Sequence, residues 1–413
     1  MTALEIPTPA RPPLPARDLR PPSIGLYTYS TLPRGSVVHT ACLADALVDL
    51  GYDVTVYALD KDARGFFRPL RARLRLVPAG RAPSSTAALV RQRSDELASY
   101  LIAHGEAHDV HHAQDCLSAA GLLAARALGR RLRLARTVHH VEAFADPYLA
   151  RCQERSIREA ELCFTVSEAA RADVQHVFGV DSLVVGNGVD ARRFSDVLVS
   201  RLRVWRARLG AGAPVVLAVG GVEERKNTLR LLGAFARLHA QRPDARLWIL
   251  GGATVLDHGA YRAEFDRARD RLPPETRAAV IQLGVVPEAD VPALFQLADV
   301  VAMPSLHEGF GLAALEALAA GRPLVASARA PFTEYLDAGC AVLVDPLSEE
   351  AIATGLDDAL VASPARREAG RRRAEAHSWA GVAARHARLY PTLAAENERM
   401  ANHARDALLD PLA

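Results

Sequence analysis

The chain has 413 residues, half of them apolar, and a formal net charge of +2 at pH 7. This length predicts two domains with sizeable cores, and the balanced charge argues against a dedicated nucleic-acid-binding protein. The five cysteines are scattered and form no CxxC pair, which is typical of a protein in the reducing cytosol.

Residues 1–22 contain seven prolines and three arginines and no apolar run. This composition predicts a disordered Pro-rich tail. A secretory signal peptide is not expected, because its hydrophobic region is missing. Order is expected to begin at Ser23.

The ordered chain opens with a strand, a turn at Gly35–Ser36, a helix at His39–Leu50 and a second strand at Val54–Ala58. This order is a βαβ unit of a parallel sheet. The turn lacks the GxGxxG pattern, so a dinucleotide cofactor is not expected, and we predict no other cofactor. The turn is either an ordinary βα turn or one that faces a ligand.

Aromatic and basic residues are interleaved in residues 64–76, RGFFRPLRARLRL. We favour the interpretation that this segment is a solvated basic edge of the first domain. The alternative is contact with an acidic acceptor or, peripherally, with the inner face of a membrane. No apolar run reaches 18 residues, so no membrane span is predicted, and the expected location is the cytoplasm.

Two groups of histidines follow. His108, His111 and His112 do not predict a metal site, because neighbouring residues of a strand point to opposite faces of the sheet. A later strand, at Leu132–Val138, ends immediately before His139. A side chain at the carboxyl end of a parallel strand lies at the ligand crevice of an open α/β sheet. His139 is therefore either a ligand-facing histidine or a hydrogen-bonded core histidine.

The strand–helix alternation restarts after a glycine turn at 186–188, and the first turn of this second half reads GGVEERKNTL. Lys226 lies there just before a helix, for which Asn227 is the candidate N-cap. Only two of the 50 basic residues are lysines, so a lysine is exceptional in this chain. A compact ammonium at this place can meet phosphate oxygens, and we expect it to face a solvent-filled cleft.

The most informative stretch is Asp299–Ser327, DVVAMPSLHEGFGLAALEALAAGRPLVAS. It predicts a strand, a glycine turn at 309–311, a helix at Leu312–Ala320 and another strand. The glycines and the helix N-terminus favour an anion such as a diphosphate. Glu308 and Glu316 flank this position, and their carboxylates can accept hydrogen bonds from sugar hydroxyls. The alternative is that one is an ordinary loop acid and the other a solvated helix residue.

The stretch HEGFGLAALEALAAGRPLVAS resembles the donor-site signature of the retaining glycosyltransferases of family 4, which have the GT-B fold. The resemblance covers residues 23 to about 395. It implies an α/β fold with two Rossmann-like, doubly wound parallel-sheet domains that face each other across a cleft. The first domain would comprise residues 23–192 with a returning C-terminal helix at 379–413, and the second residues 193–378.

The resemblance also implies roles for individual residues. Glu308 would meet the donor sugar, Glu316 the nucleotide ribose, and His139 the sugar and diphosphate. The diphosphate would lie against the N–H groups of the turn and against a lysine–arginine pair. These donor-binding groups are Gly309, Phe310, Gly311, Leu312, Lys226 and Arg225, with Gly35 and Ser36 facing the cleft from the first domain. His139, Lys226 and Glu308 would be the catalytic residues, without a metal.

Two departures from the family pattern stand out. Gly221 occupies the position where these enzymes usually carry arginine, and Arg225 would replace that charge. His140 stands where the family often has Asp. The resemblance predicts a retaining transfer from a nucleotide sugar to a hydroxyl of a glycan, lipid or small-molecule acceptor. The alternatives are a degenerate nucleotide-sugar-binding protein, an epimerase of the same fold or a phosphorylase.

Overall fold

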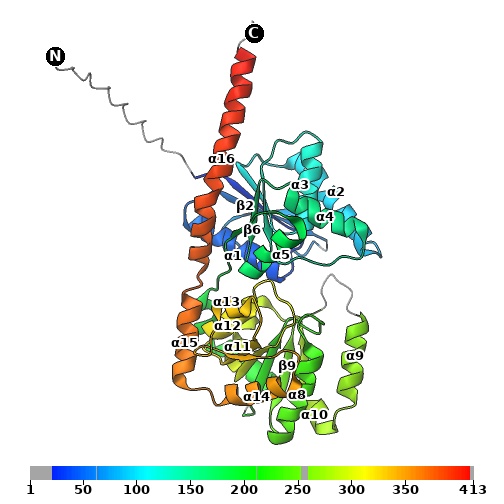
Figure 1. The fold of residues 1–413 in the computed structure, drawn as a ribbon, viewed down its shortest axis with the longest axis vertical. Helices are drawn as coiled ribbons and strands as arrows, with labels where there is room; N and C mark the ends of the chain where they lie inside the picture. The colour runs from blue at the N-terminus through cyan, green and yellow to red at the C-terminus, as the bar shows by residue number, and fades with distance from the viewer. Residues whose placement is uncertain (1–20, 62, 211, 253–258, 410–413) are drawn as a thin grey trace, which may run out of the picture.

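The computed structural model describes residues 21–61, 63–210, 212–252 and 259–409, with side chains up to residue 394. The predicted Pro-rich tail therefore lies almost entirely outside the described residues. Two parallel sheets, each covered by helices on both faces, are stacked along the long axis of the molecule (Figure 1). This confirms the predicted architecture of two Rossmann-like domains.

The first sheet has seven strands in the order β3-β2-β1-β4-β5-β6-β7. The strands are β1 (Ile24–Thr28), β2 (Val54–Asp60), β3 (Arg73–Pro78), β4 (Val110–Ala113), β5 (Leu134–Val138), β6 (Leu162–Thr165) and β7 (Leu183–Val184). All residues of β1 and β2 are buried, as expected for parallel strands covered on both faces. The strand order reverses between β1 and β4, and ligands of open α/β sheets bind outside the carboxyl ends of the strands at such a switch point.

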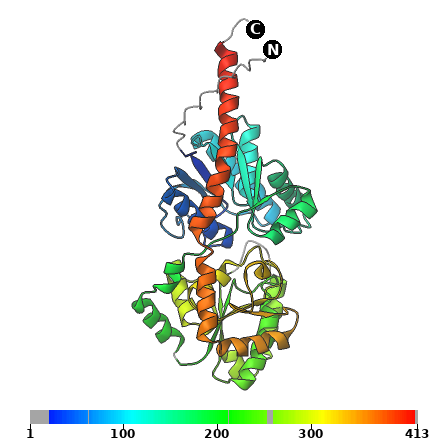
Figure 2. The ribbon, with the colours of Figure 1, turned by 60° about the vertical axis from the view of Figure 1, so that its left-hand side comes forward.

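Helices pack on both faces of this sheet. The helices of the first half are α1 (Gly35–Asp49), α2 (Thr86–His104), α3 (Cys116–Ala127), α4 (Pro147–Arg158) and α5 (Glu168–Phe178). The long final helix α16 (Trp379–Leu409) returns to this sheet and packs beside α1 (Figures 1 and 2). Its residues Trp379, Val382 and Tyr390 are buried in the same core cluster as Leu43 and Leu47 of α1.

The second sheet has six strands in the order β10-β9-β8-β11-β12-β13. They are β8 (Val215–Val219), β9 (Arg246–Leu250), β10 (Val280–Gly284), β11 (Val300–Met303), β12 (Leu324–Ser327) and β13 (Val342–Val344). Strands β8 and β11 pair in parallel although about 80 residues separate them, with Leu217 opposite Val301. The switch point of this sheet therefore brings the turns that follow β8 and β11 together.

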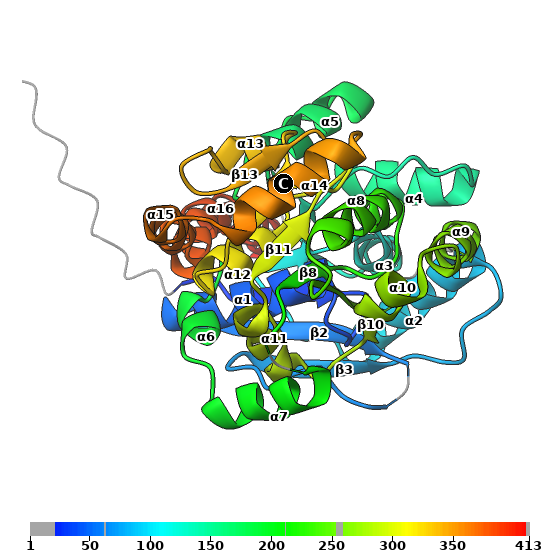
Figure 3. The same ribbon diagram turned by 90° about the horizontal axis from the view of Figure 1, so that it is seen from below.

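Helices also cover both faces of the second sheet, as the view along the long axis shows (Figure 3). They are α6 (Ala191–Ser195), α7 (Val199–Leu209), α8 (Thr228–Gln241), α9 (Gly259–Asp270), α10 (Pro274–Ala279), α11 (Val291–Leu297), α12 (Leu312–Ala319), α13 (Phe332–Tyr335), α14 (Glu349–Leu360) and α15 (Pro364–Glu375), with a short 3-10 turn at Glu288–Asp290. One core cluster lies under α11 and α12, and the other lies under α8 and α14.

One local expectation, for Gly35, was wrong, and another, for Asn227, was confirmed only in position. Gly35 does not form a turn before the helix but is the first residue of α1, four residues before the predicted start. Asn227 occupies the N-cap position of α8, but its side chain makes no capping bond. Its amide instead donates to the carbonyl oxygens of Pro304 and Pro346, at 2.9 and 2.6 Å. Asn227 thus ties the first turn of the second domain to the loop after β11.

The basic segment 64–76 packs along the domain edge. Arg68 and Arg71 form ion pairs with Asp45 and Asp49 of α1. Arg73 and Arg75 both pair with Glu106, so much of the positive charge is neutralised within the domain. No helix in the part of the chain that the structure describes is long and apolar enough to cross a membrane.

Candidate active site

The site begins at the switch point of the second sheet, where Glu308 follows β11 and Lys226 follows β8. The Lys226 ammonium lies 2.6 Å from Oε1 of Glu308, and the Ser305 hydroxyl donates to the same oxygen at 2.9 Å. Arg225 approaches the other oxygen, Oε2, at 3.3 Å. Burial raises the pKa of Glu308, but the charges of Lys226 and Arg225 outweigh it and hold the pKa below 4.5. Glu308 is therefore ionised and held by two cations.

The expectation that Lys226 faces a solvent-filled cleft was wrong. Only 12% of its side chain is exposed, because the chain folds closely around it. Gly220 lies against it: a Cβ at that position would be 2.5 Å from Cε of Lys226, so the lysine side chain would have to shift. The backbone of Arg225 also accepts hydrogen bonds from Leu306 and His307, which fixes the two turns together.

Arg225 is the second cation of the site. It lies between two acids, with its Nε 2.9 Å from a carboxylate oxygen of Glu223 and its Nη1 near Glu308. Gly221, at the family's arginine position, has φ +78°, and a Cβ there would lie 3.0 Å from the carbonyl oxygen of Gly252. A side chain at position 221 would therefore be strained.

The glycine turn between β11 and α12 is fixed by its neighbours on both sides. Gly309 lies so close to the first domain that a Cβ would clash with the carbonyl oxygen of His139. Gly311 has φ +90°, and a Cβ there would lie 2.5 Å from the ring of Phe332. Phe310 is buried, and the partly buried Leu312 packs against the core cluster of the first domain. The N-terminus of α12 is therefore held at the boundary between the two domains.

Glu316 lies one turn into α12 and is partly buried. No other described residue donates a hydrogen bond to its carboxylate or pairs with it. Burial raises the pKa of Glu316 from 4.5 to about 7, although the nearby Arg193 acts in the opposite direction. The ion pair between Arg193 and Glu288, 2.6 Å long, lies beside it. Ligand hydroxyl groups would supply the donors that this carboxylate lacks.

The first domain contributes His139, which directly follows β5. Its ring meets that of His39 edge-on, with the ring centroids 4.8 Å apart. Burial, together with the charges of His39 and Arg136, lowers the pKa of His139 well below 6.5. Its buried Nε2 has no hydrogen-bond partner among the described residues. His139 is thus a neutral imidazole, and its backbone touches the glycine turn of the second domain.

The other candidates of the first domain are less tightly constrained. Gly35 is exposed, and a Cβ on it would meet nothing within 4 Å. Ser36 is partly buried, and its carbonyl oxygen accepts a 2.7 Å hydrogen bond from Thr40. Both lie in the first turn of α1. His39 lies in the next turn of the same helix, where its ring contacts that of His139. The exposed His140 forms a pair with Glu142, with Nε2 and a carboxylate oxygen 2.8 Å apart.

The histidines of β4 behave as the strand geometry predicts. The hydroxyl of Tyr27 lies 2.7 Å from His111, whereas His112 contacts Tyr390 and Thr137 on the opposite face. Within the described ranges, no group of three or more His, Cys, Asp or Glu side chains is arranged to hold a metal ion.

Sequence reasoning missed three residues that hold the site. Ser167 donates to the carbonyl oxygen of Gly309 at 2.7 Å. Glu334 accepts hydrogen bonds from the first domain, and Tyr335 stacks on Phe310. No local pattern marks these residues, because each acts through a partner that is distant in the sequence.

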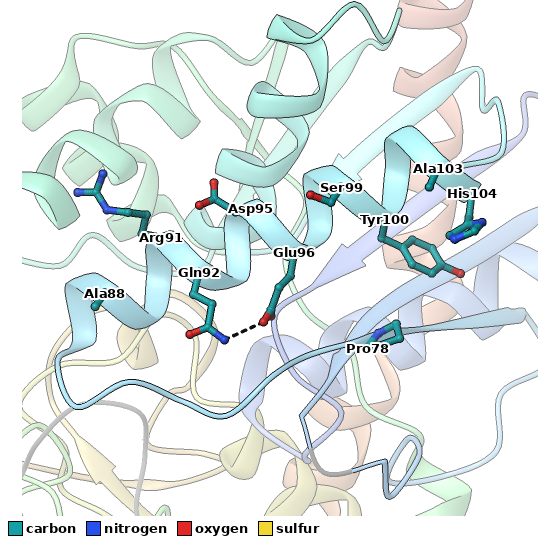
Figure 4. Close-up of a pocket in the computed structure, with 10 residues that line it drawn as sticks. All are labelled: Pro78, Ala88, Arg91, Gln92, Asp95, Glu96, Ser99, Tyr100, Ala103 and His104. Atoms are coloured by element: carbon teal, nitrogen blue, oxygen red, sulfur yellow. Dashed lines mark hydrogen bonds between the residues drawn. The ribbon is translucent and has the colours of Figure 1, made fainter.

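A separate cavity lies in the first domain, away from the candidate site. It is a cavity of about 720 Å³ along α2, beside the edge strand β3 (Figure 4). The side chains of Gln92 and Glu96 are hydrogen-bonded within it, at 2.8 Å. The residues that line it do not include any of the predicted site residues.

Comparison with known proteins agrees with this geometry. Residues 33–193 match the family model "Glycosyltransferase Family 4", and residues 204–376 match "Glycosyl transferases group 1". A GDP-mannose-dependent alpha-(1-6)-phosphatidylinositol monomannoside mannosyltransferase of Mycolicibacterium smegmatis is 33% identical over 282 residues, which cover 65% of this chain and 68% of that protein. A D-inositol 3-phosphate glycosyltransferase of Corynebacterium urealyticum is 30% identical over 319 residues, which cover 70% and 73% of the two chains.

Solved structures show the same fold. A sucrose-phosphate synthase from Thermosynechococcus elongatus superposes with a TM-score of 0.74 at 21% identity, covering 91% of this chain and 99% of that one. The arrangement of the two sheets, the two family models and the sequence relatives all point to one family. The chain therefore belongs to the GT-B glycosyltransferases, with a family 4 domain followed by a group 1 domain.

Proposed function

We propose that this glycosyltransferase moves a sugar from a nucleotide-sugar donor to an acceptor hydroxyl, with retention at the anomeric carbon and without a metal ion. The observation that carries the proposal is the placement of Lys226 and Arg225 around Glu308, three residues before Gly311, the N-cap of α12. The name of the mycobacterial relative, a GDP-mannose-dependent enzyme, supports a nucleoside diphosphate sugar as the donor.

The donor would lie across the switch point of the second domain. Its diphosphate would accept hydrogen bonds from the N–H groups of residues 309–312, where the helix N-terminus favours an anion. Lys226 and Arg225 would exchange part of their contact with Glu308 for the phosphate oxygens. Glu316 would accept hydrogen bonds from the ribose, and Glu308 from the sugar.

The chemical step requires stabilisation of the negative charge that grows on the leaving diphosphate. The two cations and the turn would supply it, because they are already in place before the bond breaks. The neutral His139 would stand beside the sugar as a hydrogen-bonding group. The leaving phosphate oxygen could then take the proton of the acceptor hydroxyl, so that retention needs no protein nucleophile.

The acceptor would bind to the first domain, which we assign to residues 23–192 together with the returning helix from residue 379. Residues 193–378 would form the donor domain. Membership of the glycosyltransferase family favours transfer over the binding-only, epimerase and phosphorylase alternatives.

The test is a panel of UDP-, GDP- and ADP-sugars, with release of nucleoside diphosphate measured with and without candidate hydroxyl acceptors. NMR of the product then gives the anomeric configuration. We expect turnover with one donor class, retention and full activity in EDTA. An inverted product would refute the retaining mechanism, and loss of turnover in EDTA that magnesium or manganese restores would refute metal independence.

A further inference from the structure

The four-residue helix α13 joins the donor turn to the first domain. Its Tyr335 is 5% exposed and stacks on Phe310, with ring centroids 4.7 Å apart and planes 2° from parallel. The Tyr335 hydroxyl donates to the carbonyl oxygen of Phe310 at 2.9 Å, and the carbonyl oxygen of Gly311 lies 3.3 Å away. Burial raises the pKa of this hydroxyl well above 10, so it remains a donor.

These contacts set the direction of the turn's N–H groups. In a trans peptide the carbonyl oxygen and the N–H hydrogen point to opposite sides. A hydroxyl that fixes the carbonyls of Phe310 and Gly311 therefore directs the N–H groups of Gly311 and Leu312 away from Tyr335. Those N–H groups belong to the N-terminus of α12, where an anion is stabilised.

The neighbouring Glu334 binds the other domain. Its two carboxylate oxygens accept hydrogen bonds from the backbone N–H groups of Glu168 and Ala169, both at 2.8 Å. These are the first residues of α5, where a negative charge is favoured by the helix dipole. Ser167, the N-cap of α5, donates at the same time to the carbonyl oxygen of Gly309.

Three successive carbonyls of the donor turn are thus held from outside it: one by Ser167 of the first domain, and two by Tyr335 of α13. The contacts of Ser167 and Glu334 exist only while the two domains touch. We infer that α13 couples closure of the two domains to the shape of the diphosphate-binding turn, with Tyr335 and Glu334 as positioning residues. This inference rests on the proposed function, because it takes the turn as the diphosphate site.

The experiment measures binding of GDP, UDP and ADP by calorimetry, together with steady-state kinetics, for Tyr335→Phe, Glu334→Gln and the double variant. Tyr335→Phe keeps the ring stack and removes only the hydroxyl. We expect it to weaken binding of the accepted nucleotide and to lower kcat/KM, each by about tenfold. Glu334→Gln should also weaken binding, and small-angle scattering should show a more open average shape.

If the two residues act through one turn, the double variant should lose less affinity than the two single losses multiplied together. Tyr52→Phe is the matched control, because it removes a hydroxyl bound to the Ala387 carbonyl, remote from the turn; it should bind nucleotide normally. If the affinity loss of the double variant equals the two single losses multiplied together, or if Tyr335→Phe binds nucleotide normally, the coupling is overturned and the proposed function stays intact. Failure of the unsubstituted protein to bind any of the three nucleotides would overturn both the coupling and the proposed function.

Discussion

The ammonium group of Lys226 lies 2.6 Å from Glu308, and the two side chains expose only 12% and 6% of their surfaces. Each charge is therefore mostly desolvated and depends on the other. Removing or displacing one partner of such a pair is costly, because the remaining charge is left unpaired. In the function that we propose, the donor diphosphate would compete for Lys226, so this contact would link donor binding to the state of Glu308.

We predict that Lys226→Arg lowers kcat/KM by roughly tenfold to a thousandfold, about 1.4 to 4 kcal/mol. The guanidinium is larger, planar and forked, and would displace the diphosphate that we propose to bind there. Because the side chain is buried, the melting temperature should fall as well. The other lysine of the chain, Lys61, is exposed, so Lys61→Arg is the matched control and should change neither quantity. Wild-type turnover in Lys226→Arg would remove Lys226 from the phosphate site.

The two glutamates should separate in steady-state kinetics. Glu316 would hold the ribose equally in the ground state and the transition state, so Glu316→Ala should mainly raise the donor KM. Glu308 would act on the sugar as it distorts, so Glu308→Ala should mainly lower kcat. Both constants are measured over a series of donor concentrations. A lowered kcat in Glu316→Ala together with a raised KM in Glu308→Ala would contradict these roles.

Glu316 also predicts a pH dependence of donor binding. Its pKa of about 7 in the free protein means that a proton must leave before the carboxylate can accept hydrogen bonds from the ribose. Donor KM should therefore rise as the pH falls below 7, approaching tenfold per pH unit in the limit. In Glu316→Gln the donor KM should be higher at pH 8 and nearly independent of pH. An unchanged pH profile in this variant would show that another group titrates.

The raised pKa of Glu316 also makes the free energy of unfolding depend on pH. A carboxyl whose pKa is raised on folding, from 4.5 to about 7, stabilises the folded state fully below pH 4.5, and this contribution is lost as the pH rises to 7. At 1.4 kcal/mol for each pKa unit, the upper bound of this contribution is about 3.5 kcal/mol. Glu316→Gln should therefore be more stable than the unsubstituted protein at pH 8, as measured by urea unfolding, with little difference at pH 5.

The buried histidines should make the folded protein less stable as the pH falls, which is opposite to the effect of Glu316. Burial lowers the pKa of His39 to about 4 and that of His386 to about 3, against an ordinary value of 6.5. The unfolded chain binds protons first, so stability should be lost as the pH falls below 6.5. His386→Phe should reduce this acid sensitivity, measured as unfolding free energy between pH 7 and 5. An unchanged slope would mean that His386 does not contribute.

Much of the fold was predictable because the pattern is local. Strand β2 begins at the predicted Val54 and helix α12 at the predicted Leu312, since apolar runs and turn residues delimit them. Helices α7 and α9 were not predicted, because their sequences are rich in arginine and their apolar faces are weak. The strand order, and with it the meeting of Lys226 and Glu308, follows from the switch point of a parallel sheet.

The remainder of the site depends on contacts that a sequence does not display. Nothing near Tyr335 indicates that its hydroxyl holds carbonyls 24 and 25 residues earlier. Lys226 was expected to face solvent because its position in a turn suggests exposure, whereas the glycine beside it allows the side chain to be enclosed. The pairing of the two domains, through Glu334 and Ser167, is likewise a tertiary property.

The central claim is that Lys226 and the glycine turn bind the diphosphate of the donor. The most direct measurement is calorimetric titration of GDP, UDP and ADP, each beside its nucleoside monophosphate, into the unsubstituted protein and Lys226→Ala. We predict that one diphosphate binds at least tenfold more tightly than its monophosphate, and that Lys226→Ala abolishes this preference. Equal affinity of both proteins for the diphosphate would contradict the account.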